Sequence, residues 1–71
     1  MVQRVLMYRK SENGTPSRED FEFLVNEVKN TDNIARLEFF IPYNGVHYVN
    51  VDKNSDIDEL MKTYSKRVYP V

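Results

Sequence analysis

The sequence contains no cysteine and no tryptophan, and it has one histidine and two glycines among its 71 residues. The absence of cysteine excludes disulfides and thiolate zinc sites, so a metal would need oxygen or histidine ligands. Gly14 and Gly45 stand far apart in the sequence, which excludes a glycine-rich phosphate-binding loop. We therefore predict neither a metal nor a cofactor, and the length predicts a single domain over residues 1–71.

A long hydrophobic run is also missing. The apolar start of the chain is interrupted by Arg4 and closed by Arg9 and Lys10, so it is too short and too charged for a signal-peptide core. No apolar run approaches the roughly 20 residues of a membrane-spanning helix. These absences predict a cytoplasmic protein without a membrane partner.

The clearest local signal is a β-hairpin around Asn44-Gly45. This pair lies between two runs rich in β-branched and aromatic residues, 36–43 and 46–52, and favours a two-residue turn with Tyr43 opposite Val46. Pro42 cannot donate a ladder hydrogen bond, which indicates an edge strand or the end of the pairing. Alternation then predicts a core face and a second, partly apolar face. The core face holds Leu37, Phe39, Ile41, Tyr43, Val46 and Tyr48, and the second face holds Glu38, Phe40, Pro42, His47, Val49 and Val51.

Two helices are predicted on either side of the hairpin. Ser17 and Asp20 form a capping sequence, and apolar residues at helical spacing follow it up to Val28. A second helix is predicted after Ser55, which would be its N-cap, and Pro70 prevents its continuation. The apolar stripe of this second helix consists of Ile57, Leu60, Met61, Tyr64 and Val68.

A strand over residues 2–9 and a loop over residues 11–16 complete the order β-α-β-β-α. This order predicts the α+β class: a two-layer fold whose three-stranded, mainly antiparallel sheet has both helices packed on one face. Two strand arrangements are compatible with the order. The first strand lies beside the third in a split β-α-β sheet, which we favour, or beside the second in a mixed sheet.

Recognisable catalytic motifs are absent from the sequence. Residues 52–56 begin like a calcium loop, but Ile57 replaces the glycine and Thr63 the bidentate glutamate that such a loop requires. We interpret the segment as a polar turn whose acids cap the second helix. His47 is the only histidine, and no nucleophile pairs with it by a known spacing. The protein is therefore predicted not to be an enzyme.

Charge is unevenly distributed along the chain. Residues 1–18 and 60–71 each carry a net charge of +3, whereas residues 19–59 carry −7. If folding gathers the acids of the middle segment, they form a negative surface that steers association with a positive one. The predicted protein-binding residues are Glu19, Glu22, Glu27, Asp52, Asp56, Asp58 and Glu59.

The leading functional hypothesis is therefore a small non-catalytic regulator or inhibitor that docks its acidic face on a basic protein. A nucleic-acid-binding protein is the natural candidate, because its phosphate-binding surface attracts carboxylates, and small acidic proteins that imitate DNA act in this way. A second hypothesis is direct binding of nucleic acid through a basic pole, although a sequence pI near 5.7 argues against it. That pole would consist of Arg4, Arg9, Lys10, Lys62, Lys66 and Arg67.

The second face of the hairpin supports a third hypothesis, a structural subunit that self-associates. Its apolar residues would form an exposed strip if both helices cover the opposite side of the sheet. A homodimer would cover such a strip. The predicted dimer interface consists of Phe40, Pro42, His47, Val49 and Val51, unless the C-terminal residues 69–71 fold over it.

Overall fold

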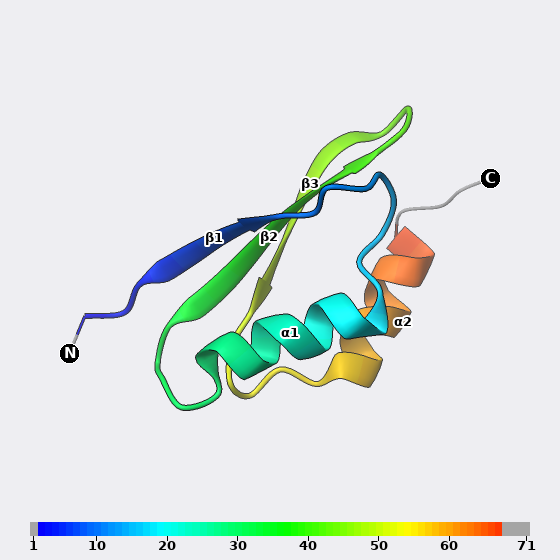
Figure 1. Ribbon diagram of the computed structural model, residues 1–71. Helices are drawn as coiled ribbons and strands as arrows, with labels where there is room; N and C mark the ends of the chain where they lie inside the picture. Colours follow the sequence, from blue (N-terminus) through cyan, green and yellow to red (C-terminus); the bar gives the residue numbers. More distant parts are fainter. Residues whose placement is uncertain (1, 68–71) are drawn as a thin grey trace.

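The computed structural model describes residues 2–67, and the side chains of residues 2–64. Its elements confirm the predicted order and the α+β class, and both helices lie on the same side of the sheet (Figure 1). The predicted features at Val68, Pro70 and residues 69–71 lie outside the described residues. The elements are β1 (Val5–Arg9), α1 (Arg18–Val28), β2 (Ile34–Ile41), β3 (Gly45–Val51) and α2 (Ile57–Arg67).

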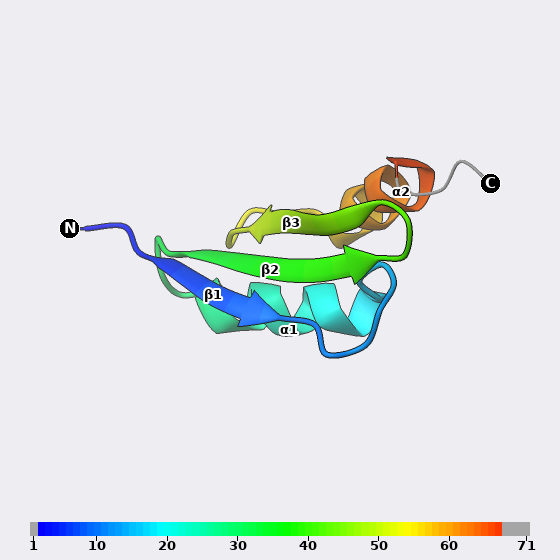
Figure 2. The same ribbon diagram turned by 90° about the horizontal axis from the view of Figure 1, so that it is seen from above.

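The sheet is mixed, with β2 in the centre. β1 runs parallel to β2 from Val5 opposite Ile34 to Arg9 opposite Glu38, and β3 runs antiparallel to β2. The split arrangement that we favoured is therefore wrong, because β1 lies beside β2 and not beside β3. The segment β1-α1-β2 forms a parallel crossover unit, in which α1 covers one face of the sheet and joins two strands that pair side by side (Figure 2).

The hairpin has a different turn from the one predicted. Its loop has three residues, Pro42, Tyr43 and Asn44, and the amide of Asn44 donates to the carbonyl of Ile41 at 3.0 Å. Proline fixes a φ near −65°, which suits the second position of a β-turn and not the middle of a ladder. Tyr43 follows with φ +71°, and Gly45, at φ +86°, pairs with Ile41. The preference of Pro42 therefore outweighs that of Asn44-Gly45 for a two-residue turn.

This turn shifts the predicted pairing by three residues, and an odd shift turns one strand over. Phe39 lies opposite His47, and Leu37 lies opposite Val49. The predicted core side of β2 is confirmed for Leu37, Phe39 and Ile41, but Tyr43 lies in the loop and is fully exposed. The two sides of β3 are exchanged, so that Val46 and Tyr48 are exposed as well. The buried core consists of Phe21, Leu24, Val28, Ala35, Leu37, Phe39, Ile41, Val49 and Val51.

Each helix begins after a residue whose side chain accepts hydrogen bonds from the first backbone amides of the helix. The predicted capping box of α1 is confirmed: the Ser17 hydroxyl accepts from the Asp20 amide at 3.2 Å, and the Asp20 carboxylate accepts from the Ser17 amide at 2.8 Å. The N-cap of α2 is not Ser55 but Asp56, whose carboxylate accepts from the amides of Asp58 and Glu59. Residues 52–56 thus form the predicted polar turn.

Candidate functional site

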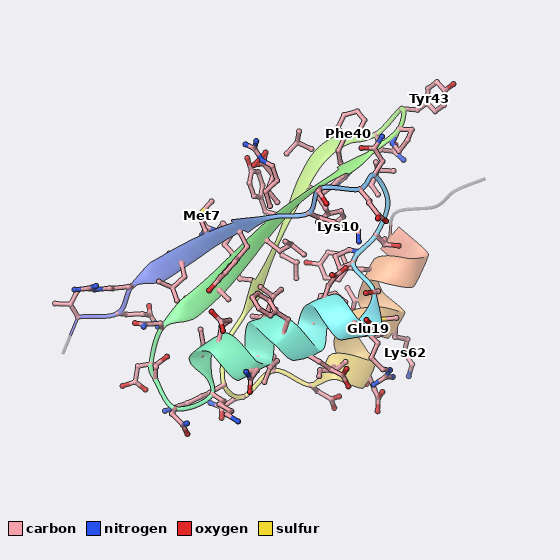
Figure 3. The ribbon with its side chains drawn as sticks, in the orientation of Figure 1. Met7, Lys10, Glu19, Phe40, Tyr43 and Lys62 are labelled. Atoms are coloured by element: carbon pink, nitrogen blue, oxygen red, sulfur yellow. The ribbon has the colours of Figure 1, made fainter. Side chains whose placement is uncertain are left out.

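Five of the seven predicted protein-binding acids meet where the starts of the two helices lie together. Glu19 and Glu22 are in the first turns of α1, while Asp56, Asp58 and Glu59 surround the start of α2. We call these five residues the acidic surface. All of them are exposed. Figure 3 shows Glu19 at this end of the molecule, close in the view to Lys62 of α2.

Arg18 joins the two helix starts. Its guanidinium forms an ion pair with Asp58, across 40 positions of sequence. The hydrogen bond and the charge of Asp58 raise the pKa of Arg18, and the charges of Glu22 and Asp56 add to this effect. Arg18 is thus a cation set among acids, and it lowers the negative charge of the acidic surface without cancelling it.

The other two predicted acids lie elsewhere. Glu27 is near the end of α1, where it accepts a hydrogen bond from the hydroxyl of Tyr8 at 3.0 Å. Burial raises the pKa of Tyr8, and so do the hydrogen bond and the charge of Glu27. Asp52 follows β3 and turns back into its own loop, accepting from the amide of Asn54 at 2.9 Å. Neither residue extends the acidic surface.

The proposed basic pole is dispersed in the described part of the chain. Arg9 pairs with Glu38 at 3.3 Å, and Lys10 pairs with Asp20 at 2.9 Å in a partly buried position. Arg4 precedes β1, while Lys62 lies on α2 beside the acidic surface. The side chains of Lys66 and Arg67 lie outside the described residues.

The predicted dimer interface does not form one surface, because the register turns β3 over. Val49 and Val51 are 2% and 1% exposed and belong to the core. His47 also lies on the helix side, stacked on Phe39, and Pro42 is in the hairpin loop. Phe40 alone keeps its predicted place on the side of the sheet that faces away from the helices.

Besides Phe40, that outward side, which we call the open sheet face, carries apolar residues that the sequence analysis did not place there. Phe40 has Val46 opposite it on β3, and Met7 of β1 is 59% exposed (Figure 3). Val5 and Tyr48 are exposed as well. Between these residues, polar pairs hold the middle of the face: Arg9 with Glu38, and Arg36 with Asn50 at 2.8 Å. The face is thus two small apolar patches separated by a polar band.

A chemically reactive constellation is not found in the described residues. No group of three or more histidine or acidic side chains there is arranged to hold a metal ion. His47 has a buried Nε2 atom without a hydrogen-bond partner among those residues, and its ring neighbour is Phe39. Neither described helix is long and apolar enough to cross a membrane.

The structure also reveals a groove beside the first strand. It has a volume of about 380 Å³ and lies between β1 and α1. Phe23 of α1 lines it and is 52% exposed, so one side of its ring is accessible from the groove. In the helical spacing, Phe21 and Leu24 lie on the core stripe and Phe23 lies off it. An aromatic residue in that position was the signal in the sequence that could have indicated the groove.

Comparison of the chain with protein-family models, with curated proteins and with solved structures finds no match in any of the three.

Proposed function

We propose that this protein is a small non-catalytic binding module that docks its acidic surface on a basic protein partner. The observation that carries the proposal is the meeting of five exposed carboxylates at the joined helix starts. The described side chains at these two helix ends supply two cations, Arg18 and Lys62, and Arg18 is engaged by Asp58. The local charge is therefore negative although the whole chain is nearly neutral.

The chemistry of this surface suits a partner that normally binds phosphate. The backbone of the two helix starts fixes where these side chains leave the chain, so several negative charges are presented together without ordering a flexible loop. A groove that binds DNA or RNA attracts such charges through its lysines and arginines. A nucleic-acid-binding protein is thus the partner class that we propose, with the acidic surface taking the place of phosphates.

The alternative of direct nucleic-acid binding has less support. A nucleic-acid site needs cations gathered on one face, and Arg9 and Lys10 are each paired with a carboxylate. Self-association through the predicted strip has lost its geometric basis, because Val49 and Val51 are in the core.

The proposal is tested by affinity capture from nuclease-treated lysate at low and high salt. The variant Glu19→Gln/Glu22→Gln removes two charges from the acidic surface while keeping two good helix formers. The matched control Glu12→Gln/Asp32→Asn removes two charges from exposed positions outside it. We expect basic proteins to be captured by the natural chain and the control, and to be released by salt.

The acidic-surface variant should capture much less of the same proteins. Equal capture by both variants would overturn the proposal, as would capture that salt does not weaken. A gel-shift assay with labelled DNA and RNA tests direct nucleic-acid binding. Retardation of the nucleic acid by this protein alone favours direct binding. If this protein instead prevents the captured partner from retarding the nucleic acid, the acidic surface occupies the partner's phosphate-binding site.

A further inference from the structure

β1 is an edge strand whose outer side is open for hydrogen bonding. The Arg4 carbonyl accepts from the Ile34 amide at 2.8 Å, and the Lys10 amide donates to the Glu38 carbonyl at 2.9 Å. Even-numbered residues of this segment therefore direct their backbone groups toward β2. By alternation, the amides and carbonyls of Val5, Met7 and Arg9 point to the free side, where the described chain supplies no further strand. Such an edge is a template for an added strand.

A side-chain groove lies under this edge. Asp20, Phe23 and Glu27 form one stripe of α1, and each contacts the inner row of β1 or its continuation. Asp20 binds Lys10, the Phe23 ring meets the Tyr8 ring edge-on with centroids 5.6 Å apart, and Glu27 binds the Tyr8 hydroxyl. The groove of about 380 Å³ is within the range of ligand-binding clefts. Its apolar wall comes from Tyr8, Phe23, Leu24 and Leu37.

The position of α1 decides what kind of strand fits. Figure 2 shows α1 beneath β1 at this edge of the sheet. Neighbouring strands lie about 4.8 Å apart, whereas packed helices need roughly 8–10 Å. If a second copy paired its own β1 here around a two-fold axis, the two α1 helices would compete for the same space. A single extended segment has no such conflict.

Two side chains of α1 define the chemistry of that segment: Phe23, which lines the groove, and Glu27, which lies one turn further along α1 and binds the Tyr8 hydroxyl. Alternate side chains of an added strand point toward α1 at a spacing of about 6.7 Å, and Phe23 and Glu27 are one helical turn, about 6 Å, apart. One side chain would thus lie against Phe23 and the next one against Glu27. An apolar residue suits the first position, and lysine or arginine suits the second because of charge complementarity.

We propose that the β1 edge and the groove beside α1 bind an extended segment of another protein, which adds as a fourth strand and places an apolar and a basic side chain two residues apart. This site is separate from the acidic surface and does not depend on it. Bound in this way, the segment covers the exposed ring of Phe23 and supplies partners for the free backbone groups of β1.

The test is an NMR titration of the full chain with a capped seven-residue peptide. The peptide has valine at its centre, lysine two residues to either side and threonine elsewhere, and a matched peptide has glutamate in place of lysine. We expect the amide signals of Val5, Met7 and Arg9 to shift and to become protected from hydrogen exchange. The amides of Leu6 and Tyr8, which already face β2, should change much less.

Variants separate this site from the rest of the surface. Phe23→Ser should weaken binding at least tenfold, and Glu27→Gln should weaken it about two- to fivefold. Met7→Pro removes an outward amide without touching the β1–β2 hydrogen bonds, so it should abolish binding. Phe40→Ser, which changes an exposed aromatic residue of the open sheet face, is the matched control and should bind as the natural chain does.

Several results would overturn the proposal: no shift at the three edge amides, shifts confined to the open sheet face, or a preference for the glutamate peptide. Unweakened binding of the lysine peptide by Phe23→Ser would also overturn it. If Met7→Pro does not fold, Phe23→Ser remains as the variant that tests the site. The variant Glu19→Gln/Glu22→Gln should bind the lysine peptide normally, so that failure of this site and failure of the acidic surface are distinguished.

Discussion

The imidazole of His47 on β3 stacks on the ring of Phe39, its partner on β2, with centroids 5.6 Å apart and planes inclined by 24°. The Nε2 atom of this imidazole is buried and has no hydrogen-bond partner among the described residues. The stacked rings fill the helix side of the sheet next to Tyr64, whose ring is 5.9 Å from Phe39. A polar ring thus occupies a position that an apolar ring would fill without an unpaired nitrogen.

We therefore expect His47→Phe to stabilise the protein by about 1 kcal/mol. The substitution keeps the stacking on Phe39 and removes a buried polar atom whose desolvation is uncompensated. Urea unfolding followed by circular dichroism measures the change. His47→Ala is the control, because it removes the unpaired atom together with the ring, and it should destabilise. Equal or lower stability of His47→Phe would contradict this account.

Tyr43 is the one non-glycine residue with positive φ in the described chain, and its side chain is fully exposed. The left-handed conformation costs a residue with a Cβ atom roughly 1 kcal/mol or more. Tyr43→Gly removes this cost. Glycine also raises the conformational entropy of the unfolded chain, which offsets part of the gain, so we expect a net stabilisation of about 0.5 kcal/mol. Tyr43→Ala retains the Cβ atom and should give no gain. Thermal unfolding of the two variants side by side makes the comparison.

Local signals predicted the start of α1 correctly and the hairpin turn wrongly. The capping box at Ser17 and Asp20 is local, and no other signal competes with it, so the start of α1 was predicted correctly. At the hairpin, two local signals compete within four residues, Pro42 and Asn44-Gly45. Choosing the wrong one shifts the register by an odd number and exchanges the sides of β3. A small local error thereby became a large error in the predicted interface.

The strand order could not be derived from local signals at all. The position of β1 is set by its pairing with β2, and this is a contact between segments that lie far apart in the sequence. The acidic surface was predictable in part, because Glu19 and Glu22 share one helix and Asp56, Asp58 and Glu59 share one turn. Glu27 lies two helical turns beyond Glu19, so its separation from the others follows from helix geometry.

Acid pH should destabilise the protein through Asp20. Burial alone would raise the pKa of this carboxyl, but the hydrogen bond from the Ser17 amide and the contact with Lys10 outweigh it, and the pKa lies below its ordinary value of 3.8. A carboxyl whose pKa is lower in the folded state stabilises that state above the unfolded-state pKa. The contribution is lost as the pH falls from about 4 through the folded-state pKa.

The variant Asp20→Asn tests this linkage. We expect it to be less stable than the natural chain at pH 7, by on the order of 1 kcal/mol, and closer to it at pH 3. Asp32→Asn is the control: the pKa of Asp32 is also lowered, by Lys53, but this pair is exposed and screened by solvent. Urea unfolding at the two pH values measures all three proteins. A constant difference between the natural chain and Asp20→Asn would show that the carboxylate charge is not responsible.

Tyr64 connects α2 to α1 and to the sheet. Its ring lies 6.1 Å from Phe21 of α1 and 5.9 Å from Phe39 of β2. Tyr64→Ala should cost about 2–4 kcal/mol, because it leaves a gap between the two phenylalanines. A domain of this size has only about 3–5 kcal/mol of net stability, so this loss removes a large part of it and the variant should unfold at a much lower urea concentration. Tyr64→Phe keeps the ring and should cost less than about 1 kcal/mol.

The NMR spectrum of Tyr64→Ala shows whether the loss is cooperative. Because the ring touches α1 and the central strand at once, we expect amide signals of the sheet and of both helices to collapse together. If only the signals of α2 changed while those of β1, β2 and β3 stayed dispersed, α2 would be an independently detachable element. The acidic surface would then be a feature that exists only while α2 is docked, since Arg18 of α1 holds Asp58 of α2.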